Sequence, residues 1–130
     1  MPIAFWCVLI AGVMPYIAVG IAKADKRYDN SAPRDWLATR EGAKKRAYAA
    51  HLNSFEAFPL FASGVVIAHL MAAPVLVVNA MAIAFVLARI VYIWCYITNH
   101  ASLRSLVWLV GFGLTVALFV VAGLQAGRLA

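Results

Sequence analysis

The stretch PIAFWCVLIAGVMPYIAVGIA, residues 2–22, contains 21 residues and no formal charge. A helix needs about 20 apolar residues to cross the roughly 30 Å hydrocarbon core of a bilayer. No basic segment precedes this stretch, and no small-residue cleavage site follows it, so it lacks the features of a cleaved signal peptide. It therefore predicts a retained transmembrane helix.

Three more stretches of similar length follow it. Residues 47–73 are interrupted only by Glu56, residues 74–98 only by Arg89, and residues 105–127 carry no charge. The whole chain is 65% hydrophobic and only 12% charged, far below the charged fraction of about 25% in soluble domains. We therefore predict an all-α integral membrane protein, a bundle of four transmembrane helices.

The orientation follows from the distribution of positive charge. The first loop, residues 23–46, holds eight of the eleven Lys and Arg residues, and short loops rich in these residues stay in the cytoplasm. We expect this loop and the third loop inside, both termini outside, and one domain over residues 1–130. The net charge of +6 then reflects topology and not a nucleic-acid partner. Compact size and the absence of sorting signals favour a bacterial inner membrane.

Two polar stripes run along the second and third predicted helices. At 100° per residue, side chains that share a face cluster within narrow arcs. The stripes comprise Arg46, Asn53, Glu56 and Ser63 on one helix and Arg89, Tyr92 and Tyr96 on the next. Glu56 and Arg89 lie at similar depths, so we predict an ion pair between them. That pair could also serve only to set the helix register.

Polar groups in lipid should face protein or a watery cavity, and four helices shield few of them. We therefore expect a cyclic homo-oligomer. Arg104 begins the fourth helix, where an arginine can act simply as an anchor at the interface. Cys7 and Cys95 lie in apolar runs without the spacing of metal ligands, so no metal site is predicted.

Three segments carry a resemblance to a known family. They are RAYAAHLNSFEAFPLF at residues 46–61, RIVYIWCY at residues 89–96, and LRS at residues 103–105. The first resembles the second-helix motif of the MAPEG family, membrane-associated proteins in eicosanoid and glutathione metabolism. The other two are similar to its third helix and the start of its fourth. Members of this family often have a basic residue one turn before the Asn, where this chain has Ala49.

The resemblance implies a homotrimer in the lipid bilayer with glutathione as co-substrate at the subunit interfaces. By resemblance, Arg104 would be the catalytic residue beside the glutathione sulfur. The residues that would bind glutathione are Arg46, His51, Asn53, Glu56, Arg89, Tyr92, Tyr96 and Ser105. Lys23 and Lys26 could add positive charge near Arg46. His51 lies off the main stripe, and a purely structural role for it stays open.

The implied function is a membrane-bound glutathione transferase or peroxidase acting on a hydrophobic electrophile or lipid hydroperoxide. The alternative is a non-catalytic, MAPEG-like lipid-binding or scaffold protein. A small transporter is a weaker alternative, because four short spans without a broken helix or repeat leave little room for alternating access.

Overall fold

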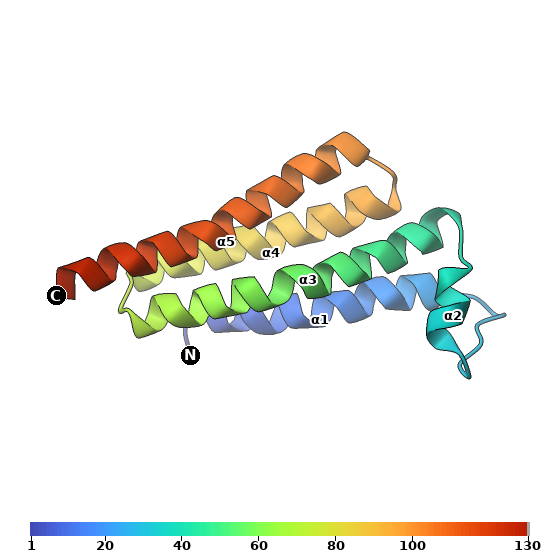
Figure 1. The fold of residues 1–130 in the computed structure, drawn as a ribbon, viewed down its shortest axis with the longest axis horizontal. Coiled ribbons are helices and arrows are strands. Elements are labelled where there is room, and N and C mark those ends of the chain that lie inside the picture. Colours follow the sequence, from blue (N-terminus) through green and yellow to red (C-terminus); the bar gives the residue numbers. More distant parts are fainter. Residues whose placement is uncertain (130) are drawn as a thin grey trace.

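A computed structural model describes residues 1–129 of the chain. The elements are α1 (Ile3–Lys23), the short α2 (Pro33–Ala38), α3 (Gly42–Leu70), α4 (Val75–Ile97) and α5 (Ala101–Leu129). The described residues contain no strand, so the predicted all-α bundle is confirmed. In Figure 1, α1 and α3 form one layer and α4 and α5 a second, all nearly parallel to one long axis.

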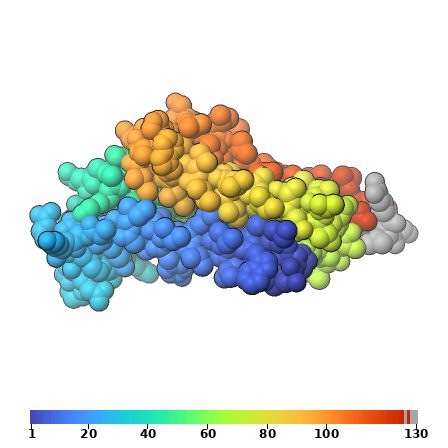
Figure 2. All heavy atoms as spheres, turned by 180° about the vertical axis from the view of Figure 1, so that it is seen from behind, coloured from blue at the N-terminus to red at the C-terminus, as the bar shows by residue number. Residues whose placement is uncertain are grey.

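The ends of the bundle are well separated. The N-terminus, the end of α5 and the α3–α4 turn lie at one end, while α2 and the α4–α5 turn lie at the other (Figure 1). From behind, the segment around α2 projects beyond the rest of the molecule (Figure 2). The two loops that we expect in the cytoplasm therefore share one end.

Three of the four long helices are long and apolar enough to cross a membrane: Ile3–Lys23, Val75–Ile97 and Ala101–Gln125. The remaining one, α3, has 29 residues but is less apolar, because it carries a basic first turn and polar side chains such as Asn53 and Glu56. It also begins at Gly42, five residues before the predicted span. The fourth long helix begins at Ala101 rather than Ser105.

Two sharp turns connect the long helices, and both use the Schellman arrangement. Ala73 donates its N–H to Ala68 after α3, and His100 donates its N–H to Cys95 after α4, each at 2.9 Å. The preceding residues, Ala72 and Asn99, have φ of 53° and 65°, the left-handed conformation that this motif requires. The turn before Pro74 thus closes without any glycine.

Small side chains allow α1 and α3 to approach closely. Every third or fourth residue of α1 is buried, and the list is dominated by alanine: Ala4, Cys7, Ala11, Met14, Pro15, Ala18 and Ala22. On α3, the buried set includes Ala47, Ala50, Gly64 and Ala68. Without a hydrophobic force between helices in lipid, such seams of small residues provide close packing contact.

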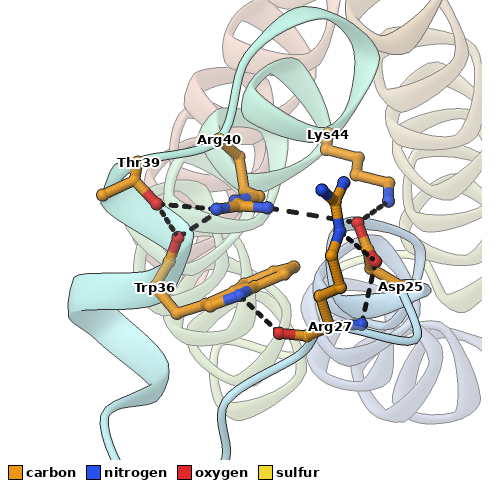
Figure 3. Close-up of polar contacts among 6 residues, drawn as sticks. All are labelled: Asp25, Arg27, Trp36, Thr39, Arg40 and Lys44. Atoms are coloured by element: carbon orange, nitrogen blue, oxygen red, sulfur yellow. Dashed lines mark hydrogen bonds and ion pairs between the residues drawn. The ribbon is translucent and has the colours of Figure 1, made fainter.

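The first loop is held to the bundle by a cluster of charges around Asp25 (Figure 3). Its carboxylate accepts a hydrogen bond from Lys44 Nζ at 2.6 Å and lies 3.5 Å from Arg27 and 4.0 Å from Arg40. These contacts hold the pKa of Asp25 well below its ordinary value. The hydrogen bond from Lys44 is the largest cause, and it joins the end of α1 to the start of α3.

Aromatic packing completes the loop. The guanidinium of Arg40 lies 3.9 Å from the centre of the Trp36 ring, and the Trp36 indole donates to the Arg27 carbonyl at 3.0 Å (Figure 3). Leu37 is buried against Ala22 and Ala47. The loop is therefore a folded cap on α1 and α3, and this cap explains why α3 begins earlier than hydropathy predicts.

We predict that Ala11→Leu destabilises the bundle, because Ala11 is 5% exposed within the apolar core that α1 and α3 share. Overpacking a tight core costs about 1–3 kcal/mol. Thermal unfolding in detergent should show a lower midpoint. Ala80→Leu, at an exposed position of α4, serves as the control. Equal thermal stability of the two variants would contradict close packing between α1 and α3 at Ala11.

We also predict that Asp25→Asn loosens the first loop without unfolding the bundle. Because the pKa of Asp25 is lowered by its contacts, its stabilisation is present above about pH 4 and is lost on acidification below that value. Tryptic cleavage at Arg40 and Lys44 should accelerate in the variant at neutral pH. Asp35→Asn, which removes no ion pair among the described residues, should leave cleavage unchanged.

Candidate functional site

Four arginine and tyrosine side chains form a continuous row along the bundle. The row begins at the end of the bundle that carries the first loop and the α4–α5 turn. The guanidinium of Arg104, in the first turn of α5, lies 4.4 Å from the Tyr96 ring centre. Tyr96 and Tyr92 meet edge to face with centroids 5.6 Å apart, and Arg89 lies 4.1 Å from the Tyr92 ring centre. The spacing of three and four residues along α4 puts these side chains on one face. We call these four residues the arginine–tyrosine row.

Arg89 is the inner end of this row and is 5% exposed. Its Nη2 donates to Asn53 Oδ1 at 3.1 Å and to Ser54 Oγ at 3.0 Å, both on α3. Ser54 in turn donates to the Ala50 carbonyl at 2.7 Å. Two side chains of α3 therefore hold a guanidinium of α4, and the polar stripes of the two helices meet as predicted.

The predicted ion pair between Glu56 and Arg89 is not a direct contact. In the described part of the chain, the ion pairs within 4.0 Å all involve Asp25. Instead, Asn53 Nδ2 donates to Glu56 Oε2 at 3.2 Å while its Oδ1 accepts from Arg89. An amide is both donor and acceptor, so Asn53 links the two charges. Glu56 remains exposed on the surface of the single chain.

A pocket of about 190 Å³ opens beside this link, between α3, α4 and α5. Its polar lining comes from Asn53, Glu56, Arg89 and Thr115, and most of the remaining wall is apolar. The apolar and small members are Ala57, Leu60, Phe85, Trp108, Gly111 and Phe112. The pocket thus combines one guanidinium and one carboxylate with an aromatic wall.

Three residues of the site were not predicted from the sequence: Ser54, Trp108 and Thr115. Ser54 looks like an ordinary helix serine, although its position next to Asn53 and two residues before Glu56 is a signal. Trp108 and Thr115 lie on α5, where no charge marks a functional face. Their spacing from Arg104, four and eleven residues, is the signal that places them on its side of the helix.

Arg46 and Ser105 lie near the outer end of the row. Arg46 Nε donates to the Ile97 carbonyl at 3.0 Å, so this arginine caps the last turn of α4 next to Tyr96. Ser105 donates to the Ala101 carbonyl of its own helix at 3.2 Å. Both residues are thus near Arg104 in the fold, and neither of them is among the residues that line the pocket.

His51 lies on a different side of α3. Its Nδ1 is 2.7 Å from the Pro15 carbonyl of α1, and its ring stacks with Tyr48 and meets Phe55 edge to face. The structure therefore does not bring His51 together with Asn53, Glu56 and Arg89 within one chain. Lys23 lies with its ammonium 5.1 Å from the Tyr28 ring centre.

The arginine–tyrosine row favours chemistry that uses an anionic reactant. Two arginines are the only cations in the row, and each lies over a tyrosine ring, which keeps the guanidinium oriented. Oriented positive charge at a partly dry site favours an anionic reactant over its neutral form. In the described residues, no group of three or more His, Cys, Asp and Glu side chains is placed to hold a metal ion.

The comparison with protein families gives a match that covers residues 3–124, nearly the whole chain. The family is MAPEG, whose members are membrane helical bundles with glutathione-related transferase and peroxidase chemistry. None of the curated proteins that we compared matches the chain. The match agrees with the resemblance of the three sequence segments and with the apolar helices of the structure. The chain is therefore an integral membrane protein that belongs to the MAPEG family.

Proposed function

We propose that this protein is a membrane-bound, glutathione-dependent transferase or peroxidase that acts on a hydrophobic electrophile or a lipid hydroperoxide. Glutathione is the co-substrate, and Arg104 stabilises its thiolate. The observation that carries the proposal is the arginine–tyrosine row, which has a guanidinium stacked on a tyrosine ring at each end.

Thiolate formation is the step that the protein must assist. A free thiol with a pKa near 8.5 is only a few per cent ionised at pH 7. Lowering that pKa by about two units requires roughly 2.7 kcal/mol of differential stabilisation. A guanidinium suits this task, because it stays protonated when it loses water. Arg104, stacked on Tyr96, is at the cytoplasmic mouth of the site, where glutathione would arrive.

The remaining charges of glutathione match side chains near the row. Its two carboxylates suit Arg46, Lys23 and Lys26, and its ammonium suits Glu56 or Asn53. Since Ala49 stands at the usual basic position, Arg46 takes over the contact from one turn lower on α3. In conjugation, the thiolate forms a bond to carbon while a leaving group departs with its electron pair, or while a C=C bond opens and takes up a proton. In peroxide reduction, the thiolate breaks the O–O bond and takes the outer oxygen, and the alcohol leaves after taking up a proton. A second glutathione then displaces water from the resulting sulfenic acid and forms the disulfide.

The proposal includes a homotrimer, with the first and third loops cytoplasmic in a bacterial inner membrane. Its support is the exposure of Glu56, which lies on α3 among three apolar helices. A charged group facing lipid near the helix centre costs about 2.5–3.5 kcal/mol on insertion scales. A neighbouring copy would cover it. The same copy would bring its own His51 and α1 to the site, which gives His51 a role that one chain does not offer.

We predict that Arg104→Ala removes most of the bound thiolate. With the pKa of the thiol raised from about 6.5 back to about 8.5, the thiolate fraction at pH 7 falls from about three quarters to a few per cent, and turnover falls with it. Ultraviolet absorbance of the thiolate in protein purified with glutathione measures this directly. Arg27→Ala removes an arginine that is 84% exposed in the first loop, and it is the matched control.

Two results would overturn this proposal. A wild-type protein that binds glutathione without thiolate absorbance at neutral pH would remove the mechanism. A wild-type protein that does not bind glutathione at all would favour the non-catalytic, lipid-binding or scaffold alternative. Full turnover by the Arg104→Ala variant would show that Arg104 does not have the proposed role.

The oligomeric state gives a separate test. Light scattering of the detergent-solubilised protein should give three chains per particle. Glu56→Leu should reduce glutathione binding and leave the particle size unchanged, because the carboxylate contacts the ligand and a leucine is accepted in an apolar interface. A monomeric wild-type particle would contradict the proposed assembly.

A further inference from the structure

We propose that a groove between α4 and α5 holds one acyl chain of a phospholipid, and that Trp94 and His100 bind the phosphate of that lipid at the α4–α5 turn. The lipid is an anionic one, of the phosphatidylglycerol type. The groove and the turn lie away from the pocket beside Arg89, so this inference goes beyond the proposed function and does not depend on it.

The groove is apolar along its whole length. It has a volume of about 360 Å³ and is open to the surroundings. Both helices that form it are long and apolar enough to cross a membrane. The residues that line it are Ala84, Leu87, Ala88 and Val91 of α4 and Val107 and Val110 of α5. None of these side chains can form a hydrogen bond, so the groove suits a hydrocarbon chain from the bilayer.

The groove lies on the opposite face of α4 from the proposed glutathione site. Arg89 is two residues from both Leu87 and Val91, which puts it about 160° away from each around the helix. None of the described residues lines both the groove and the pocket beside Arg89. An acyl chain in the groove therefore does not compete with a ligand bound in that pocket.

The depth of the groove matches one leaflet of a bilayer. On α4, Val91 lies seven residues before Thr98, and on α5, Val107 lies seven residues after His100. The near end of the groove is therefore about 10 Å from the turn on both helices, and the far end, at Ala84, is about 21 Å from it. One leaflet contains roughly 15 Å of hydrocarbon beneath a headgroup layer of about 5–7 Å. A lipid whose headgroup lies at the turn thus has its acyl chain at the level of the groove.

The width of the groove fits one alkyl chain. Its lining extends about 10 Å along α4, from Ala84 to Val91, so a volume of about 360 Å³ corresponds to a cross-section of about 36 Å². A helix about 10 Å across has a cross-section of roughly 80 Å², too large for this groove. An alkyl chain is about 4 Å wide, the contact distance between carbon atoms. The dimensions therefore favour a lipid chain over a helix of a neighbouring copy.

A cluster of polar contacts lies on the same face of α4, at the turn. Trp94 and Thr98 are about 60° and 20° from Val91 around the helix. The Thr98 hydroxyl donates to the Trp94 carbonyl at 2.7 Å, so its oxygen can accept from His100 Nδ1, which is also 2.7 Å away. The imidazole stacks on the Trp94 indole, with centroids 5.0 Å apart and 13° between the planes. These contacts fix the His100 ring at the end of α4.

Two hydrogen-bond donors of this cluster are available to a ligand. Among the described residues, Trp94 interacts through its carbonyl and its ring face, and its indole N–H has no acceptor. Trp94 is also 53% exposed. In the imidazolium form, His100 Nε2 carries a second hydrogen that Thr98 does not use. A phosphate oxygen at the turn can accept from both donors, and tryptophan is enriched at this level of membrane proteins.

The charge of the hairpin favours an anionic headgroup. Glu56 is the last acidic residue of the sequence, so α4, α5 and the turn between them carry no carboxylate side chain. The formal charges of this half of the chain are all positive: Arg89, Arg104 and Arg128. Cations close to the end of a membrane span attract anionic lipids. A phosphate at the α4–α5 turn therefore meets no repelling group on the two helices that hold its acyl chain.

The test uses the full-length protein, freed of lipid in detergent. The probe is dioleoylphosphatidylglycerol, and dioleoylglycerol, which has the same acyl chains and no phosphate, is the comparison. Native mass spectrometry counts the lipids bound per chain and gives their Kd. We expect one tightly bound phosphatidylglycerol per chain and at least tenfold weaker binding of dioleoylglycerol.

Two substitutions fill the groove from its two helices. Ala88→Phe on α4 and Val107→Phe on α5 should each raise Kd for dioleoylphosphatidylglycerol tenfold or more, so the test does not depend on the folding of one variant. Ala80→Phe is the matched control, because Ala80 is exposed on α4 one turn beyond Ala84 and does not line the groove. Thermal midpoints in lipid-free detergent should be the same for all three variants.

Two substitutions at the turn test the phosphate contacts. His100→Gln keeps a hydrogen-bonding side chain but cannot become cationic, and it should raise Kd for dioleoylphosphatidylglycerol about tenfold. Trp94→Phe keeps the ring and removes the indole N–H, and it should raise the same Kd about threefold. Neither variant should change Kd for dioleoylglycerol, which has no phosphate to lose.

Each alternative to the proposed lipid site predicts a different result. An unchanged Kd in both groove variants, or an equal rise in the Ala80→Phe control, overturns the groove as the binding site. A smaller particle in the groove variants shows that a second copy of the chain covers the groove instead. Equal binding of the two probes by the wild type, or an equal rise in both Kd values in His100→Gln, overturns the phosphate site. Thiolate absorbance with glutathione is measured separately, so failure of the proposed function leaves each of these results decisive.

Discussion

The rest of the site depends on the burial of one guanidinium. Arg89 lies in a helix apolar enough to span a membrane and is 5% exposed. An uncompensated charge there would be expensive, so its surroundings must provide hydrogen bonds and an aromatic face. Asn53 and Ser54 give the hydrogen bonds from α3, and Tyr92 gives the face from α4. This requirement, together with the stacking of Phe61 on Phe85, sets which turn of α3 lies opposite which turn of α4.

On the opposite side of α3, the small buried residues between α1 and α3 hold α3 in the position that these contacts with Arg89 require. Ala11 and Met14 of α1 and Phe61 of α3 belong to one buried core, and Ser54 lies at the edge where that core meets Arg89. Because α1 fixes one face of α3, the opposite face is left to present Asn53 and Glu56 to the pocket. The support and the site are therefore two faces of one helix, and the apolar core positions the polar row.

The sequence predicts the fold well because its strongest signals are local. Both the uncharged stretches of about 20 residues and the periodicity of the polar stripes can be recognised without knowledge of tertiary contacts. The convergence of Asn53, Arg89, Tyr92 and Tyr96 also follows from helical phase and depth. The contact between Glu56 and Arg89 does not, since phase and depth cannot say which of two neighbouring side chains reaches the guanidinium first. The direction of His51 depends on the Pro15 carbonyl of α1, and the pocket wall depends on α5, which has no charge to mark a face.

The position of Glu56 is the main support for the proposed homotrimer. Within the chain, Asn53 satisfies one carboxylate oxygen of Glu56, and the side chain is otherwise exposed at the mouth of a pocket that is open on one side. The same face of α3 carries Leu60, which is 45% exposed, while Trp108 and Phe112 are exposed on α5. A bilayer could cover the apolar groups but would penalise the carboxylate, and water could solvate the carboxylate but not the aromatic wall. This face of α3 and α5 therefore needs an apolar partner for its exposed side chains and a polar partner for the Glu56 carboxylate. A second protein surface together with a bound polar ligand would provide both. A neighbouring copy that covers the apolar part of the pocket and a ligand that pairs with the carboxylate would then meet on the same face of α3.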